Sequence, residues 1–110
     1  PDLRQGVGPL AGIEAALVAT GGAVLVLAVD MPLVKPATLV RLLERAAGAD
    51  ADAVVPRHKQ GDEPLCAWYG PACLGPARLL LDRGERAVFA LFPLVRSIFV
   101  EYEDGAEFLS

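Results

Sequence analysis

Short apolar segments of two kinds alternate along the chain, with turn residues between them at regular intervals. Residues 23–29 are apolar without interruption, which is typical of a strand covered on both faces, as in a parallel sheet. Residues 36–47 carry Leu and Ala at intervals of three and four, which predicts an amphipathic helix. Pro36 suits the first turn of this helix and Gly48 its C-terminal end.

The other segments continue the alternation. A helix is expected from Pro9 to about Thr20. Strands are expected over residues 53–55, closed by Pro56, over 65–69 and over 97–102, and helices over 71–82 and over 86–92, before Pro93. Helices that alternate with buried strands predict an α/β fold, in which a mostly parallel sheet lies between two layers of helices. In such sheets ligands bind beyond the carboxyl ends of the strands.

Composition allows one domain with a full core and excludes several classes of protein. The 110 residues are 54% hydrophobic, which excludes a disordered chain. The longest stretch without a charged residue, residues 15–29, is shorter than the ~20 residues that span a bilayer. The first residues show no basic region followed by an apolar one, so we expect neither a membrane protein nor a secretory signal.

Charge and cysteine content limit the kinds of binding partner and the cellular location that we expect. Residues 1–100 carry equal numbers of acidic and basic side chains, and the net charge of −4 comes from residues 101–107. A neutral body with an acidic end is not expected to bind nucleic acid. Cys66 and Cys73 have no partner at metal-binding spacing, so we expect buried, reduced thiols and a cytoplasmic protein.

Asp30 is the first candidate for chemistry. It directly follows the most apolar predicted strand, and Pro32 keeps the chain from entering a helix at once. One carboxylate at such a position, with water and substrate phosphates, is a common way to hold Mg²⁺. The alternative is a turn former whose carboxylate binds its own backbone.

The second candidate is the glycine-containing loop that opens the first helix, residues 6–12. Glycines allow close backbone approach, and free N–H groups at a helix start favour an anion. The alternative is structural: Pro9 in the first turn and small residues for tight helix packing.

Other polar and aromatic residues have structural explanations that we favour. His58, the single histidine, lies in a polar segment with Arg57 and Lys59 and is expected to be solvated. Trp68 and Tyr69 are expected in the core, and the acidic end is expected to form a solvated edge.

Several motifs occur together in a characteristic order. They are Asp2, the segment GPLAGI at residues 8–13, VDMP at 29–32, Pro64-Leu65 with Ala67 and Tyr69, and Leu80 with GER at 84–86. In this order they resemble the molybdenum cofactor guanylyltransferase family and its nucleotidyltransferase relatives. The similarity extends over nearly the whole chain.

The resemblance implies a fold, an activity and site residues. The fold would be that of the nucleotide-diphospho-sugar transferases, which is Rossmann-like. Asp30 resembles the aspartate that binds Mg²⁺ and, through it, GTP; Asp2 resembles an aspartate that contributes to GTP binding; and Gly8, Pro9, Leu10 and Gly12 resemble part of the wall around the nucleotide. The implied reaction transfers GMP from GTP to molybdopterin and releases pyrophosphate. It requires no general base, because the acceptor phosphate is already anionic.

Two family features have no counterpart in these 110 residues. They are a glycine-rich loop of the kind LAGGxSxRMG followed by Lys, and an Asn-rich NxNTP segment. We therefore expect residues 1–110 to be a single nucleotidyltransferase domain without these two parts, and inactive in isolation. Glu63 stands where the family often has His before Pro64, which leaves the acceptor open.

Three alternatives stay open at this point. The nucleotide could be CTP instead of GTP, or the acceptor another phosphorylated molecule. The chain could also be a nucleotide-binding or regulatory domain without catalysis. No oligomeric state is predicted.

Overall fold

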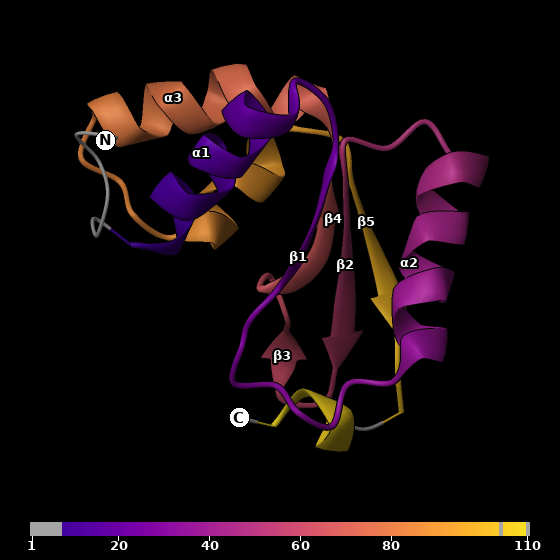
Figure 1. Cartoon of the computed structure of the whole chain (residues 1–110). Helices are drawn as coiled ribbons and strands as arrows, with labels where there is room; N and C mark the ends of the chain where they lie inside the picture. Colours follow the sequence, from indigo (N-terminus) through magenta and orange to yellow (C-terminus); the bar gives the residue numbers. More distant parts are fainter. Residues whose placement is uncertain (1–7, 104, 110) are drawn as a thin grey trace.

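A five-stranded sheet forms the centre of the computed structural model, which describes residues 8–103 and 105–109. The strands are β1 (Val24–Leu27), β2 (Ala53–His58), β3 (Gly61–Asp62), β4 (Cys66–Tyr69) and β5 (Ser97–Glu101). The α-helices are α1 (Pro9–Thr20), α2 (Pro36–Gly48) and α3 (Leu74–Asp82), and the 3-10 helices are η1 (Pro71–Cys73), η2 (Val88–Leu94) and η3 (Ala106–Phe108). Figure 1 shows how these elements are arranged.

The sheet is mixed, with three of its strands running in the same direction. β4 lies between β1 and β2 and is antiparallel to both, while β5 pairs parallel to β2 on its other side. The short strand β3 forms a hairpin with the end of β2, beyond the point where β2 pairs with β4. β1, β2 and β5 therefore point the same way, and their carboxyl ends lie at one edge of the molecule (Figure 1).

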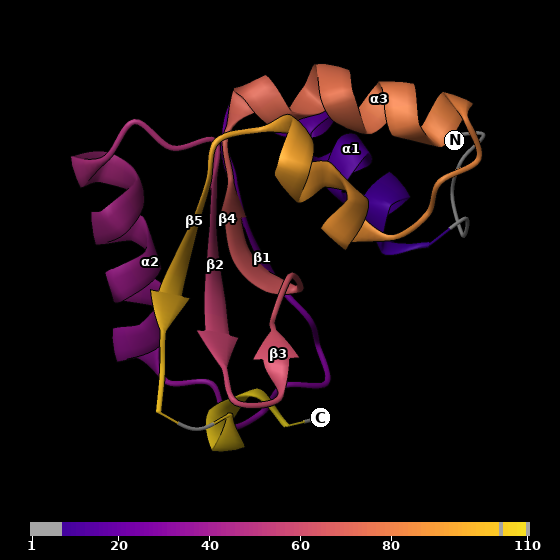
Figure 2. The ribbon, with the colours of Figure 1, turned by 180° about the vertical axis from the view of Figure 1, so that it is seen from behind.

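Helices cover both faces of this sheet, as Figures 1 and 2 show from opposite sides. On one face, α1, α3 and η2 pack against the strands through a core that includes Leu10, Ile13, Ala77 and Leu91. On the other face, α2 and η3 close a second core around Leu42, Val54, Val100 and Phe108. The predicted α/β fold with helices on both sides of the sheet is confirmed.

Most predicted elements are present, and the helix predicted from Pro9 to Thr20 has those bounds. The prediction that Pro56 closes its strand is wrong, because β2 continues to His58. The Pro56 carbonyl accepts a hydrogen bond from the Glu63 N–H at 2.9 Å, so the ring nitrogen also faces the side of β3 and β4. The missing N–H falls where the ladder passes from β4 to β3 and no donor is required.

Two other boundaries differ. The strand predicted over residues 23–29 is shorter, and Val29 is fully exposed in the turn that follows. The helix predicted before Pro93 is the 3-10 helix η2, which contains Pro93. No helix in the described ranges is long and apolar enough to cross a membrane.

Candidate functional site

Asp30 lies in an exposed turn at the carboxyl end of β1. The turn begins at Ala28, whose carbonyl accepts a hydrogen bond from the Met31 N–H at 3.3 Å. The Ala28 N–H donates to the Leu65 carbonyl at 2.8 Å, which ties the start of the turn to the chain before β4. Asp30 is therefore at the edge of the sheet where ligands of α/β proteins bind.

The loop before α1 is held by close backbone contacts. Gly8 has φ +117°, a conformation that favours glycine, and a Cβ there would lie 3.1 Å from the Cβ of Arg86. The Leu10 N–H donates to the Arg86 carbonyl at 3.3 Å, and the Leu10 side chain is fully buried. Tight packing therefore explains Gly8 and Leu10 without a ligand.

A groove of about 520 Å³ separates α1 from the outer edge of β1. Its lining residues are Pro9, Gly12, Ile13, Ala16, Val24, Leu25, Val26 and Leu65. Gly12 has open space where a Cβ would be, although glycine inside a helix costs about 1 kcal/mol relative to alanine. Of the residues predicted to surround the nucleotide, Pro9 and Gly12 face this groove, whereas Leu10 belongs to the core. Asp2 lies outside the described residues.

The structure places His58 differently from its prediction. Its side chain is only 6% exposed and stacks on Phe108, with ring centroids 5.5 Å apart. A Cβ at Gly105 would lie 2.4 Å from the imidazole Cε1, so the chain before η3 closes over the ring. The expectation of a solvated His58 is wrong, because Phe108 and Gly105, far along the sequence, cover it.

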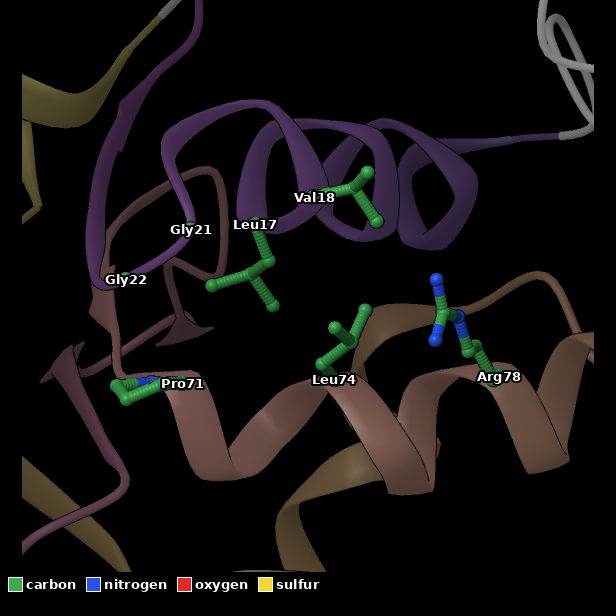
Figure 3. Close-up of a pocket in the computed structure, with 7 residues that line it drawn as sticks. All are labelled: Leu17, Val18, Gly21, Gly22, Pro71, Leu74 and Arg78. Carbon is green, nitrogen blue, oxygen red and sulfur yellow. The ribbon is translucent and has the colours of Figure 1, made fainter.

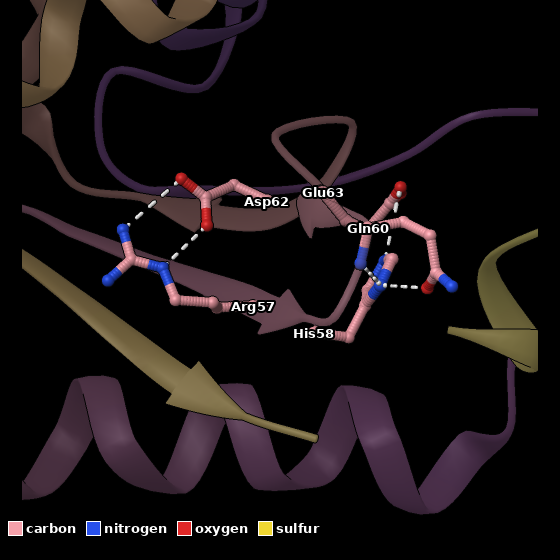
Figure 4. Close-up of polar contacts among 5 residues, drawn as sticks. All are labelled: Arg57, His58, Gln60, Asp62 and Glu63. Atoms are coloured by element: carbon pink, nitrogen blue, oxygen red, sulfur yellow. Dashed lines mark hydrogen bonds and ion pairs between the residues drawn. The ribbon is translucent and has the colours of Figure 1, made fainter. Parts of the chain in front are cut away.

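The neighbours of His58 form a polar cluster at the end of β2 (Figure 4). The Gln60 N–H donates to His58 Nδ1 at 3.1 Å, and His58 Nε2 lies 3.7 Å from Glu63 Oε1. Arg57 pairs with both carboxylate oxygens of Asp62, at 2.7 and 3.3 Å. The cluster borders a second pocket, of about 420 Å³, which is closed on its other side by residues 105–109.

The acidic end is not solvated throughout. The Glu107 carboxylate accepts a hydrogen bond from the Thr38 hydroxyl and another, at 3.3 Å, from the Lys35 N–H. These bonds satisfy donors at the start of α2 and hold η3 against it. The expectation of a solvated edge is therefore wrong for Glu107, while Glu101 and Glu103 are exposed.

A third pocket, of about 220 Å³, lies between α1 and α3. Leu17, Leu74 and Arg78 point toward this space (Figure 3), and Arg78 lies 3.5 Å from the Glu14 carboxylate. Gly21 and Gly22, just before β1, form part of its lining. This pocket is at the end of the sheet opposite Asp30 and is not part of the predicted site.

The cysteines and the strand aromatics agree with their predictions. Cys66 and Cys73 are buried and free, and burial raises the pKa of each thiol to about 11. Tyr69 is buried, and its hydroxyl donates to the Pro64 carbonyl at 2.5 Å. Burial raises the pKa of this hydroxyl well above its usual value. Trp68 packs on the second core from β4.

Asp30 is a candidate ligand for a metal ion that a substrate would also bind. No group of three or more His, Cys, Asp or Glu side chains in the described part of the chain is arranged to hold a metal ion. A single exposed carboxylate, such as that of Asp30, matches the way proteins bind Mg²⁺ together with substrate phosphates.

A sheet covered on both faces by helices, with a carboxylate at the carboxyl end of a strand, defines an α/β domain of the class that binds ligands at that edge of the sheet. The chain belongs to the MobA-like NTP transferase domain family, which it matches over residues 1–98. Among its relatives, it is 39% identical over 105 residues to the "Probable molybdenum cofactor guanylyltransferase" of Pelotomaculum thermopropionicum, covering 94% of this chain and 50% of the relative. It is 33% identical over 96 residues to the molybdenum cofactor guanylyltransferase of Desulfosudis oleivorans, covering 86% of this chain and 47% of the relative.

A solved structure gives the same relationship. The molybdopterin-guanine dinucleotide biosynthesis protein A of Archaeoglobus fulgidus superposes with a TM-score of 0.81 at 34% identity, over 91% of this chain and 50% of that one. The chain therefore spans about half the length of the relatives that it matches.

Proposed function

We propose that the protein transfers GMP from GTP to molybdopterin and releases pyrophosphate, in a reaction that depends on Mg²⁺. The observation that carries the proposal is the position of Asp30, at the carboxyl end of β1, in a chain whose relatives are named for guanylyl transfer in cofactor synthesis. The two buried, free thiols support a cytoplasmic location.

In this proposal Asp30 holds the metal and thereby orients the triphosphate. Mg²⁺ bound there would neutralise charge on the leaving pyrophosphate. The carboxylate stands in an exposed turn, so substrate phosphates can approach it from solvent. The oxygen of the acceptor phosphate forms the new bond to the α-phosphorus of GTP, and the bond to the pyrophosphate oxygen breaks.

The groove beside α1 suits the uncharged part of the nucleotide. Pro9 and Gly12 present small, apolar surface there, and the bare Cα of Gly12 allows a planar ring or another backbone to come close. Asp2 is proposed as a further GTP contact. We place the main phosphate-binding loop in the half of the relatives that this chain does not match.

The test is Asp30→Ala in the full-length protein. Steady-state GMP transfer should fall at least about 100-fold, because a lost electrostatic contact to the reacting phosphates has an effect of this size. Asp50→Ala is the control, since Asp50 is an exposed carboxylate that pairs with Arg96 at 2.8 Å. An unchanged rate for Asp30→Ala across a magnesium titration would contradict the assignment of Asp30 as the metal ligand.

The nucleotide and the activity are tested separately. Competition between GTP and CTP for binding to the full-length protein distinguishes guanylyl from cytidylyl transfer. Binding of GTP without any transfer to molybdopterin would favour the alternative, a nucleotide-binding domain without catalysis.

A further inference from the structure

The pocket at the end of β2 has one carboxylate in its lining. Of the described residues that form it, Glu63 supplies the carboxylate, and the rest are His58, Gln60, Gly105, Ala106, Phe108 and Leu109. Its volume, about 420 Å³, is within the range of small-molecule sites. It lies at the same end of the sheet as Asp30, because β1 and β2 point the same way.

Glu63 is held in this pocket from two sides. Its backbone N–H donates to the Pro56 carbonyl at 2.9 Å, which fixes the residue beside β2. Its Oε1 lies 3.7 Å from His58 Nε2, and its side chain is 20% exposed, toward the pocket. The carboxylate is thus positioned by the fold and still accessible to a ligand.

The contacts of His58 place its Nε2 toward Glu63. Nδ1 lies 3.1 Å from the Gln60 backbone nitrogen and 3.0 Å from the Gln60 side-chain oxygen, so both contacts to Gln60 are on the Nδ1 side of the ring. That buried Nε2 has no hydrogen-bond partner among the described residues, and the nearest acceptor is Glu63 Oε1. His58 is therefore a positioning residue, whose Nε2 faces one oxygen of the carboxylate.

Charge excludes one end of each proposed substrate from this pocket. Both GTP and molybdopterin carry phosphate, which the Glu63 carboxylate repels. Both also carry an uncharged 2-amino-4-oxopyrimidine ring, in guanine and in pterin, whose ring N–H and amino group point the same way. A carboxylate accepts such a pair of parallel N–H groups with its two oxygens.

We propose that Glu63, positioned by His58, recognises the 2-amino-4-oxopyrimidine edge of a substrate in the pocket between the end of β2 and residues 105–109. The choice between its two sources rests on the proposed function, whereas recognition of the ring itself does not. Ala106 and Leu109 add apolar surface to the lining of the pocket, against which the faces of such a ring can pack.

The experiment compares ligands that differ by one group. Calorimetric titration of the full-length protein with pterin and with lumazine, which has a carbonyl in place of the amino group, should show pterin binding at least tenfold more tightly. Guanosine against inosine, which lacks the amino group, is the second arm. Whichever amino-bearing ligand shows the larger preference identifies the acceptor or the nucleotide as the source.

Variants assign the preference to the two residues. Glu63→Gln should reduce the preference for the amino-bearing ligand to threefold or less, because the new amide offers an N–H toward an N–H. Glu101→Gln, an exposed change on β5 outside the pocket, should leave it unchanged. His58→Phe should weaken pterin or guanosine binding, and His58→Gln, which places an amide nitrogen near the Nε2 position, should restore it.

The proposal is overturned if neither ligand pair shows a preference, or if Glu63→Gln keeps the full preference while folding as the parent does by circular dichroism. These binding measurements do not depend on catalytic turnover. A preference that depends on Glu63 would stand even if GMP transfer were absent, and a failed preference would leave the test at Asp30 intact.

Discussion

The close contact between Gly105 and the His58 ring determines which residue fits at position 105. A Cβ at position 105 would lie 2.4 to 2.8 Å from three atoms of the imidazole, which is held between Phe108 and the turn at Gln60. Since the ring is fixed on both sides, it has little room to move away. Position 105 therefore requires glycine, because a larger residue would clash with the imidazole ring.

Gly105→Ala should lower the free energy of unfolding by roughly 1–3 kcal/mol, the usual cost of adding volume to a packed site. Gly75→Ala, in α3, is the matched change, because nothing lies within 4 Å of a Cβ there and alanine favours a helix. Urea unfolding of both variants measures the difference. Equal stability of the two variants would contradict the packing that we describe around His58.

The buried thiols should be unreactive in the folded protein. With a pKa of about 11, each is a thiolate in only about one molecule in a thousand at pH 8. We expect Ellman's reagent to modify neither Cys66 nor Cys73 in native buffer and both in guanidinium chloride. Rapid reaction of one thiol in native buffer would show that it is accessible.

The sequence alone predicted the burial of some of these side chains and not of others. The apolar surroundings of Cys66 and Tyr69 in the sequence were enough to predict burial. His58 was not predictable, because its neighbours in sequence are polar and the residues that cover it are brought there by β5 and η3. The same holds for Glu107, whose hydrogen-bond partners lie at the start of α2.

At the scale of elements, β1 is paired on one side within the described part of the chain. The register with β4 directs the backbone groups of Val24, Val26 and Ala28 toward β4. Those of Leu25 and Leu27 consequently point to the opposite edge, beside the groove next to α1. This edge is apolar on both faces of the strand.

Amide hydrogen exchange should report this alternation. In the isolated chain, the N–H groups of Leu25 and Leu27 should exchange faster than those of Val26 and Ala28, which are hydrogen-bonded to the neighbouring chain segment. Exchange measured by two-dimensional NMR distinguishes them residue by residue. If all four are equally protected in the isolated chain, the outer edge of β1 is covered in a way that the described residues do not provide.

Local signals explain which elements the sequence predicted well. Pro9 and the glycines after Thr20 mark the ends of α1, and the apolar spacing marks α2. Pro56 misled the prediction, because its tolerance depends on the gap between β3 and β4, which exists only in the assembled sheet. The antiparallel direction of β4 also had no local signal.

For the whole molecule, buried acids that stay neutral set the response to alkali. Cys66, Cys73 and Tyr69 have raised pKa values in the folded state because burial disfavours their charged forms. The unfolded chain loses these protons at lower pH. The stability that the two thiols contribute is complete below about pH 8.5 and is lost as the pH rises toward 11, whereas that of Tyr69 begins to be lost only above about pH 10.

We therefore expect the free energy of unfolding to fall between pH 8.5 and 10.5, by up to about 1.4 kcal/mol per pH unit for each thiol. Cys73→Ala should make this slope shallower. Ser97→Ala removes a half-buried hydroxyl that donates to the Phe92 carbonyl at 3.0 Å but does not titrate, so it should lower stability without changing the slope. Urea titrations over this pH range provide the measurement, and parallel slopes for all three proteins would contradict the role of the thiol.

The position of β4 also has a consequence for the order in which the chain folds. β1 is made early, but its partner β4 follows α2, β2 and β3. The sheet therefore closes through contacts between distant parts of the sequence, which slows folding. On the ribosome, β1 has no partner strand among the described residues until residues 66–69 have emerged, and during that interval its apolar side chains are open to capture by a chaperone.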